Sequence, residues 1–249
     1  MKKRVAPVAI LFLLLSSAFS CADSSSQKNT TINNTGNGFA VVELFTSEGC
    51  SSCPPADNAV AKLLKEYNNV YVLGYHVDYW DNLGWKDAFS NADYTKRQKN
   101  YARTLKSGIY TPQVIVNGEA QFVGSDENKL HAAINKDLKD NPQQDLSIIA
   151  TQNDNTIKVS YQTNSSDNLN IALVQLNAET KVQRGENQGV TLHHVNIVRS
   201  FQTIALKNNT GNISLNLPAG LSAKDCAVIA FTQDANMRVT SAAKTNIRL

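Results

Sequence analysis

The fold of this chain is decided by residues 39–57, FAVVELFTSEGCSSCPPAD. Residues 39–45 form a short apolar run that is typical of a buried strand, and a turn follows. Cys50 and Cys53 come next, separated by two serines, and residues 54–57 (PPAD) suit the first turn of a helix, where the leading N–H groups need no partner within the helix. The stretch therefore predicts a strand, a turn and a helix, with the cysteine pair at the helix N-terminus.

The cysteine pair has the spacing of a redox-active disulfide. Two cysteines two residues apart at a helix start can close a small disulfide with little backbone movement, and the helix N-terminus brings partial positive charge and free N–H groups near the first sulfur. This lowers the pKa of Cys50 and makes it the attacking group, while Cys53 resolves the mixed disulfide. A structural disulfide and half a zinc site are the alternatives, but no second CxxC or close Cys/His pair completes four zinc ligands.

A second motif, YTPQVIVNG at residues 110–118, places Thr111 and Pro112 at the head of a strand that runs into an Asn-Gly hairpin turn. An X-Pro bond takes the cis form at little cost. A Thr-Pro downstream of a CxxC resembles thioredoxins and glutaredoxins, in which the proline is cis and packs against the cysteines. The resemblance implies a catalytic-site role for Pro112 and pairing of the Thr111 backbone with a substrate peptide; an ordinary strand-start proline is the alternative.

The chain also resembles, more specifically, a family of secreted, thioredoxin-like proteins numbered twelve-twenty-three among the domains of unknown function. The matching positions are residues 42–57, 76–81, 83–87 and 110–113, Arg97, Gln98 and Tyr101, and, further along, Gly185, Glu186, Asn187, Leu192, His193, Asn196 and Arg199. This resemblance implies a thioredoxin-like fold but supplies no substrate. The chain departs from thioredoxin at Gly49 and at the dipeptide between the cysteines, so the reduction potential is not carried over.

Apolar runs and helical stripes alternate in the order β-α-β-α-β-β-α as far as residue 141. Beyond it helical periodicity stops, and short strands separated by Asn, Asp and Gly favour a β-sandwich. The expected fold class is therefore α/β: a thioredoxin-like mixed sheet with flanking helices, followed by a C-terminal antiparallel β-sandwich. The expected parts are a signal peptide over 1–20, a flexible tether over 21–38, the thioredoxin-like domain over 39–141 and the β-sandwich domain over 145–249.

The N-terminus has the pattern of a targeting signal. A basic start at residues 2–4 (KKR), an apolar run over 5–15 and a small-residue exit over 16–20 are typical of a signal peptide, and the run is too short to span a bilayer. Cleavage before Cys21 resembles the processing of a bacterial lipoprotein, in which this cysteine is lipidated; ordinary cleavage is the alternative. Both place the protein outside the cytosol, in the periplasm or cell envelope, where disulfides persist.

Composition excludes some classes of partner. Apolar residues make up 42% of the sequence, which is enough for a packed core. Three of the 24 Lys and Arg residues lie in the signal segment, and the remaining 21 balance 21 Asp and Glu residues. This balance gives no electrostatic reason to expect a nucleic acid as partner.

An insert over residues 76–89 leaves the carboxyl end of the second expected strand, the edge where open α/β sheets bind ligands. We expect this insert to form a substrate-binding rim beside Cys50, with one histidine assisting proton transfer. The residues of the rim are His76, Asp78, Trp80, Asp81 and Trp85. A folded loop with an aromatic mini-core and turn-capping aspartates is the alternative, and a metal on this insert is disfavoured because acids are common in turns.

Two further residues are candidates. Glu43 lies on the strand before the cysteines, one residue from the register of the buried acid that thioredoxins use as a proton acceptor, so the resemblance makes it a catalytic candidate. Cys226 begins an apolar strand and is expected to be a buried thiol that behaves as a small hydrophobe.

Together these features favour an extracytoplasmic thiol–disulfide oxidoreductase, in which Cys50, Cys53, Pro112 and Glu43 carry the reaction. No cofactor and no metal is expected. The expected partners are a thiol- or disulfide-bearing protein substrate, a redox partner protein, and the membrane through lipidated Cys21. Two other functions stay open: an envelope binding or structural module with a non-catalytic disulfide, and a copper-handling protein, which the two-residue cysteine spacing disfavours.

Overall fold

The computed structural model describes residues 1–2, 38–140 and 145–249. Almost all of the predicted signal peptide, the predicted tether with Cys21, and the predicted domain boundary at residues 141–144 lie outside the described residues. The described residues from 38 onward form one compact unit. Among the helices of the described residues, none has the length and apolar character needed to cross a bilayer.

The first half of the described chain has the element order expected from the sequence. Its elements are β1 (Ala40–Thr46), α1 (Pro54–Glu66), β2 (Val70–His76), α2 (Ala92–Thr104), β3 (Gln113–Val116), β4 (Ala120–Val123) and α3 (Glu127–Asp140). Local chemistry explains the boundaries: the Asn91 side chain caps α2 by accepting a hydrogen bond from the Asp93 N–H at 2.9 Å. The predicted hairpin turn between β3 and β4 is confirmed, with positive φ at Asn117 and Gly118.

The second half is almost entirely strand, because its apolar residues alternate or run continuously rather than at helical spacing. Its elements are β5 (Leu146–Asn153), β6 (Thr156–Thr163), β7 (Asn168–Lys181), β8 (Thr191–Ala205), β9 (Thr210–Asn216), the short 3-10 helix η1 (Ala223–Asp225), β10 (Cys226–Gln233) and β11 (Val239–Arg248). β7 and β8 form a long antiparallel hairpin, whose tip is residues 182–190.

The strands of the two halves join in one sheet, and this corrects the expected fold class. The strand order is β4-β3-β1-β2-β8-β7-β10-β11-β5-β6-β9. β2 pairs in parallel with β8 where Gly74 meets Ile197. The prediction of a thioredoxin-like α/β fold followed by a separate C-terminal β-sandwich is therefore wrong: the described residues form a large mixed sheet of eleven strands with only three α-helices.

The junction between β2 and β8 explains why the sequence predicted two separate domains. Asn196 of β8 adopts φ 47° and its side-chain amide donates to the Val72 carbonyl oxygen of β2 at 3.0 Å. A parallel pairing between strands this far apart in the chain leaves no mark on the local spacing of apolar residues. A domain boundary was expected where helical periodicity stops, but a change of period says nothing about which strands become neighbours.

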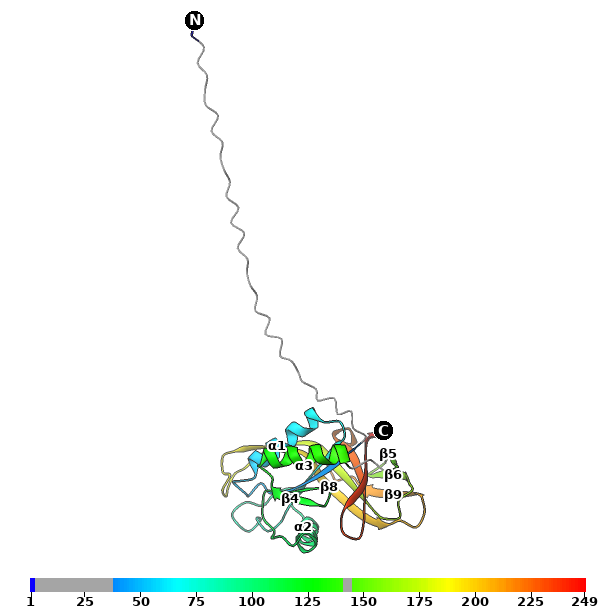
Figure 1. The fold of residues 1–249 in the computed structure, drawn as a ribbon. Helices are drawn as coiled ribbons and strands as arrows, with labels where there is room; N and C mark the ends of the chain where they lie inside the picture. The colour runs from blue at the N-terminus through cyan, green and yellow to red at the C-terminus, as the bar shows by residue number, and fades with distance from the viewer. Residues whose placement is uncertain (3–37, 141–144) are drawn as a thin grey trace. The chain divides into compact units, whose positions relative to one another are not determined.

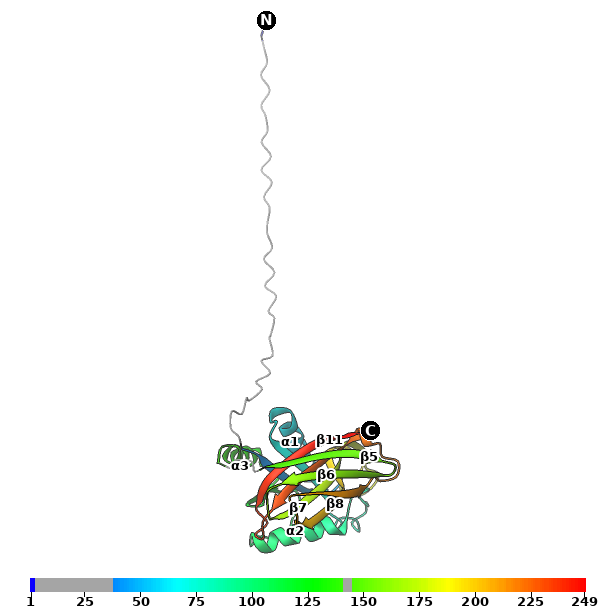
Figure 2. The ribbon, with the colours of Figure 1, turned by 90° about the vertical axis from the view of Figure 1, so that its right-hand side faces the viewer.

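The helices cover both faces of the strands from the first half, as Figure 1 shows. α1 and α3 pack on one face through residues such as Leu63 and Ile134. α2 lies on the opposite face, where Tyr94 and Tyr101 share a buried core with residues of β7, β8, β10 and β11, among them Phe231. A third cluster lies among the C-terminal strands, of which β5, β6 and β11 cross the view in Figure 2.

A buried ion pair lies in the core beneath α2. Arg97 donates to Glu43 through Nε at 2.5 Å and through Nη2 at 2.9 Å, and the Tyr101 hydroxyl donates to the same carboxylate. Gln233 of β10 bonds to both Arg97 and Tyr101. The guanidinium carbon lies 4.9–5.7 Å from the centroids of four aromatic rings, those of Tyr75, Tyr101, Phe201 and Phe231. The two halves of the chain therefore share one buried charge pair.

We expect a fragment of residues 38–140 not to fold on its own. Without the C-terminal strands β2 loses its neighbour β8, and the Glu43–Arg97 pair loses Gln233 and two of its aromatic rings. Urea unfolding followed by circular dichroism should show a cooperative transition for residues 38–249 and none for the fragment. Cooperative unfolding of the fragment would show that the halves are separable domains.

Candidate functional site

Cys50 and Cys53 form a disulfide in the turn between β1 and α1, with their Cα atoms 5.4 Å apart. The turn is closed by its own backbone, because the Cys50 N–H donates to the Ser47 carbonyl oxygen and the Cys53 N–H donates to that of Cys50, both at 3.2 Å. Cys53 is the N-cap residue of α1. The pair lies at a helix N-terminus, where the sequence places it.

The helix tip offers the sulfurs fewer free N–H groups than a usual helix start. The first two helical residues are prolines, and the next two N–H groups both donate to the Cys53 carbonyl oxygen. The Ser52 hydroxyl lies 3.3 Å from the Cys50 sulfur and 3.5 Å from the Thr111 carbonyl oxygen. We therefore expect a Cys50 thiolate to draw on the Ser52 hydroxyl as well as on the partial charge of the helix.

Both cysteines are closed to solvent, with 0% exposed area. The tip of the β7–β8 hairpin is fastened to the turn that contains them. Glu186 accepts from the Ser51 N–H at 3.1 Å and from its hydroxyl at 2.7 Å, and the Asn187 side-chain amide donates to the carbonyl oxygens of Glu48 and Cys50, each at 2.9 Å. A reagent therefore reaches the sulfurs only when packing around the turn opens.

The two tryptophans of the insert contact segments around the disulfide. Trp80 Nε1 donates to the Thr111 hydroxyl at 2.8 Å, and Trp85 Nε1 donates to Glu48 at 2.7 Å. Gly49 lies against Trp80: a Cβ at this position would stand 3.2 Å from the Trp80 Cβ. The tight contact gives a physical reason for glycine before the cysteine pair.

The two predicted substrate-binding aspartates bond within the insert and α2. Asp78 accepts from the Thr95 hydroxyl at 2.5 Å. Asp81 accepts from the Ser90 hydroxyl at 2.7 Å and from the Asp87 N–H at 3.2 Å. These are the contacts of aspartates that hold a loop in shape, which was the alternative interpretation of this insert.

The structure brings Thr111 and Pro112 beside the cysteine turn and leaves Glu43 in the core beneath α2. The peptide bond between Thr111 and Pro112 is cis, and both the carbonyl oxygen and the hydroxyl of Thr111 contact the site, through Ser52 and Trp80. The Glu43 carboxylate instead accepts hydrogen bonds from Arg97 and Tyr101. Its contacts are those of a structural ion pair.

His76 joins a buried pair with Asp87. The His76 Nδ1 lies 2.7 Å from Asp87 Oδ2, and both side chains are 1% exposed. The same carboxylate accepts from the N–H groups of Glu48 and Phe89, each at 2.8 Å. Burial alone would lower the pKa of His76, but the charge and hydrogen bond of Asp87 raise it above its usual value. Burial alone would raise the pKa of Asp87, but His76 and the two N–H groups lower it.

A second buried histidine, His194 of β8, completes a cluster next to the disulfide. Its Nδ1 lies 3.4 Å from Asp57 Oδ1 and its Nε2 lies 4.0 Å from Glu48 Oε1. Its ring centroid is 4.7 Å from that of His76. We call Glu48, Asp57, His76, Asp87 and His194 the buried acid–histidine cluster. Among the described residues, no group of His, Cys, Asp and Glu side chains is arranged to hold a metal ion.

Most of this cluster was missed by the sequence analysis. Glu48 and Asp57 flank the cysteines in the stretch that decides the fold, but acids beside a turn and in a first helical turn have ordinary structural roles. Glu186 and Asn187 were part of the family resemblance and received no role. His194 reaches the site only because β8 pairs with β2, a contact that no local pattern indicates.

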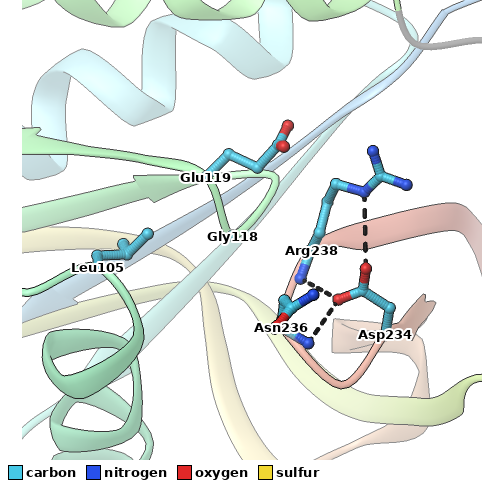
Figure 3. A pocket seen from close by; sticks show the side chains of 6 residues that line it. All are labelled: Leu105, Gly118, Glu119, Asp234, Asn236 and Arg238. Atoms are coloured by element: carbon cyan, nitrogen blue, oxygen red, sulfur yellow. Dashed lines mark hydrogen bonds and ion pairs between the residues drawn. The ribbon is translucent and has the colours of Figure 1, made fainter.

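Two cavities bear on what the site can hold. A cavity of about 160 Å³ opens at the start of α1, and Asp57 and His194 are among its lining residues; it has room for a few water molecules rather than an organic cofactor. A hollow of about 480 Å³ lies between the β3–β4 and β10–β11 hairpins (Figure 3) and is lined by none of the site residues. There Asp234 already bonds to the backbone of Asn236 and Arg238.

Comparisons with known proteins identify relatives but no activity. The family described as a protein of unknown function (DUF1223) matches residues 41–233. A crystal structure of a protein from Agrobacterium tumefaciens, a structural-genomics target, is 28% identical, has a TM-score of 0.61, and covers 82% of this chain and 92% of its own. No curated protein matches.

Structures of a β-glucuronidase from Ruminococcus gnavus are also similar, but only over a small part of the enzyme. The complex with uronic isofagomine is 8% identical, has a TM-score of 0.23, and covers 41% of this chain and 14% of the enzyme. The chain therefore spans about a seventh of that enzyme's length, and the similarity carries no argument about function.

Asp87→Asn should lower the free energy of unfolding by about 3–5 kcal/mol, because it leaves His76 buried without its carboxylate. The pKa of His76 is raised, so its contribution to the free energy of unfolding is complete below about pH 6.5 and is lost as the pH rises through the folded-state pKa. The pKa of Asp87 is lowered, so its contribution is complete above about pH 4 and is lost as the pH falls through the folded-state pKa. Urea unfolding across pH should show the widest gap from wild type between these limits. Asp93→Asn, at an exposed residue, is the control, and a gap independent of pH would contradict the assignment.

Glu186→Ala should make the disulfide react severalfold faster with dithiothreitol. The change removes both hydrogen bonds from Ser51 to the hairpin tip, and these bonds, the hydroxyl's first, are what lower the pKa of Glu186. Glu179→Ala, at an exposed acid of β7 in the same hairpin, is the matched control and should react as wild type does. Equal rates for both variants would show that the hairpin tip does not limit access.

Proposed function

The chain belongs to the DUF1223 family of proteins of unknown function, and on that premise we propose that it is a thiol–disulfide oxidoreductase whose reacting group is the Cys50–Cys53 disulfide. The observation that carries the proposal is the placement of this disulfide at the N-terminus of α1, with a hydroxyl against the first sulfur. A helix N-terminus and a nearby donor both favour a thiolate at Cys50 over one at an ordinary cysteine.

The exchange has two steps. A substrate thiolate attacks the Cys50 sulfur, the Cys50–Cys53 bond breaks, and Cys53 leaves as a thiolate that takes up a proton. The second thiol of the substrate then attacks the mixed disulfide and releases Cys50, so two electrons and two protons pass from substrate to protein. The reverse sequence reduces a substrate disulfide. A redox partner protein returns the cysteine pair to its starting state.

The N-terminal sequence supports an extracytoplasmic location for this reaction. The predicted signal peptide and Cys21 lie outside the described residues, so export, lipidation and membrane attachment rest on the sequence alone. They favour an extracytoplasmic protein, in the periplasm or cell envelope, that acts on thiol- or disulfide-bearing proteins. Trp80 and Thr111, bonded to each other beside the turn, are the substrate-binding residues that we retain from the sequence.

A second candidate function has an observation in its favour. Both cysteines are 0% exposed and the hairpin tip is bonded to their turn, as expected for a disulfide that only stabilises an envelope binding or structural module. The two candidates differ in whether the sulfurs exchange with other thiols.

Cys53→Ser tests the difference, because it removes the resolving thiol and leaves Cys50 able to form lasting mixed disulfides. Mass spectrometry under non-reducing conditions should find adducts at Cys50 in this variant and none in wild type. Cys226→Ser keeps both Cys50 and Cys53, so this control variant should form no adducts. Burial, followed by the charge of Asp225, raises the pKa of the Cys226 thiol to about 11, so this thiol should not take part in the exchange. Absence of adducts in Cys53→Ser would favour the structural module.

A further inference from the structure

Two polar atoms of the buried acid–histidine cluster have no hydrogen-bond partner. They are Glu48 Oε1 and His194 Nε2, which lie 4.0 Å apart. Glu48 is 0% exposed and His194 is 3% exposed. Because a buried polar atom without a partner costs about 1–3 kcal/mol, two of them facing each other mark a place where a proton can be held and exchanged at low structural cost.

Two carboxylates flank the ring of His194. Asp57 of α1 lies on one side of its ring and Glu48 on the other. Asp87 is already paired with His76, whose own ring stands at 4.7 Å. A cation, Arg199, is one step away, over the ring of Phe89. Asp57 and Glu48 therefore lie on either side of the His194 ring, and their charges also act on His76.

The same residues connect solvent with the cysteine turn. Asp57 and His194 line the cavity of about 160 Å³ at the start of α1. Glu48, at the other end, is two positions from Cys50, and the carbonyl oxygens of both residues accept from the Asn187 amide. The carboxylate of Glu48 also holds the Trp85 N–H. The order from solvent inward is Asp57, His194 and Glu48.

We infer that His194 exchanges protons for the cysteine pair, passing them between the cavity at Asp57 and Glu48 in the cysteine turn. The inference rests on the proposed thiol–disulfide exchange and assigns the source of its protons. His194 acts through Glu48 and is a positioning and proton-relay residue.

The relay solves a specific chemical problem. When a reductant thiolate attacks Cys50 and the S–S bond breaks, the electron pair leaves on Cys53, inside a site closed to solvent. A thiolate without water is costly, so it needs a proton from a nearby group. Protonated His194 supplies it by way of Glu48 and regains one from the cavity. The second reductant thiol then displaces Cys50, and the second proton follows the same route. The reductant becomes a disulfide, which balances two electrons and two protons.

The test compares the oxidised full chain with its His194→Gln variant. The rate of disulfide reduction by dithiothreitol is measured from about pH 5 to 9, through the range in which histidine loses its proton, and divided by the thiolate fraction of the reductant. For wild type the corrected rate should fall as pH rises. For His194→Gln it should be about tenfold lower or more at acid pH and flat with pH, because the relay is gone. His131→Gln, on α3 and outside the cluster, should match wild type.

Two further measurements keep the inference testable if His194→Gln folds poorly. Glu48→Gln should lose the same pH dependence, and the wild-type reaction should be slower in D₂O after correction for the reductant. A wild-type pH profile in both variants, with no solvent isotope effect, overturns the relay. Those outcomes leave the proposed function intact, whereas a disulfide that dithiothreitol fails to reduce in wild type and every variant contradicts the proposed function itself.

Discussion

The parallel pairing of β2 with β8 is the contact on which the rest of this structure depends. It merges the strands of the two halves into one sheet. It also brings the β7–β8 hairpin over the cysteine turn, which places Glu186 and Asn187 on the turn and His194 beside Glu48. Without this pairing the disulfide would lack the hairpin tip over its turn, and His194 would not lie beside Glu48.

The sequence predicted local features well because local chemistry decides them. The order of helices and strands up to α3 follows from apolar spacing, and the turn at Asn117 and Gly118 follows from the positive φ angles that these residues accept. The cysteine pair is at the start of α1, and Cys226 is buried, as expected. Each of these depends on a few consecutive residues.

The sequence failed where distant segments meet. The expected C-terminal sandwich was wrong as a separate domain because strand pairing between β2 and β8 is independent of periodicity. The resemblance to thioredoxins made Glu43 a catalytic candidate, and the structure shows that strand alternation turns it toward Arg97 and the aromatic core, a contact that the sequence does not indicate. Asp78 and Asp81 were expected on a binding rim; the structure shows hydrogen bonds from them within the insert and α2, and their part in substrate binding stays a prediction.

Burial of the disulfide limits both the access of thiols to its sulfurs and the supply of protons to them. A covered sulfur is protected from small thiols. The bonds that cover it include those from exposed Ser51 of the turn to exposed Glu186 of the short hairpin tip. Such contacts are weak individually and can part without unfolding of the sheet. The closed site then makes proton supply a problem that the buried acid–histidine cluster is placed to solve. The hairpin supplies both the cover over the disulfide and His194 of the cluster.

The reduction potential of the Cys50–Cys53 pair tests the central claim most directly. Equilibration of the intact protein with glutathione buffers, read by alkylation of free thiols, gives this value. A disulfide that exchanges with substrates should have a potential above about −300 mV, within reach of cellular thiol pools. A value well below about −300 mV would mean that the disulfide is a permanent structural bond and would contradict the account.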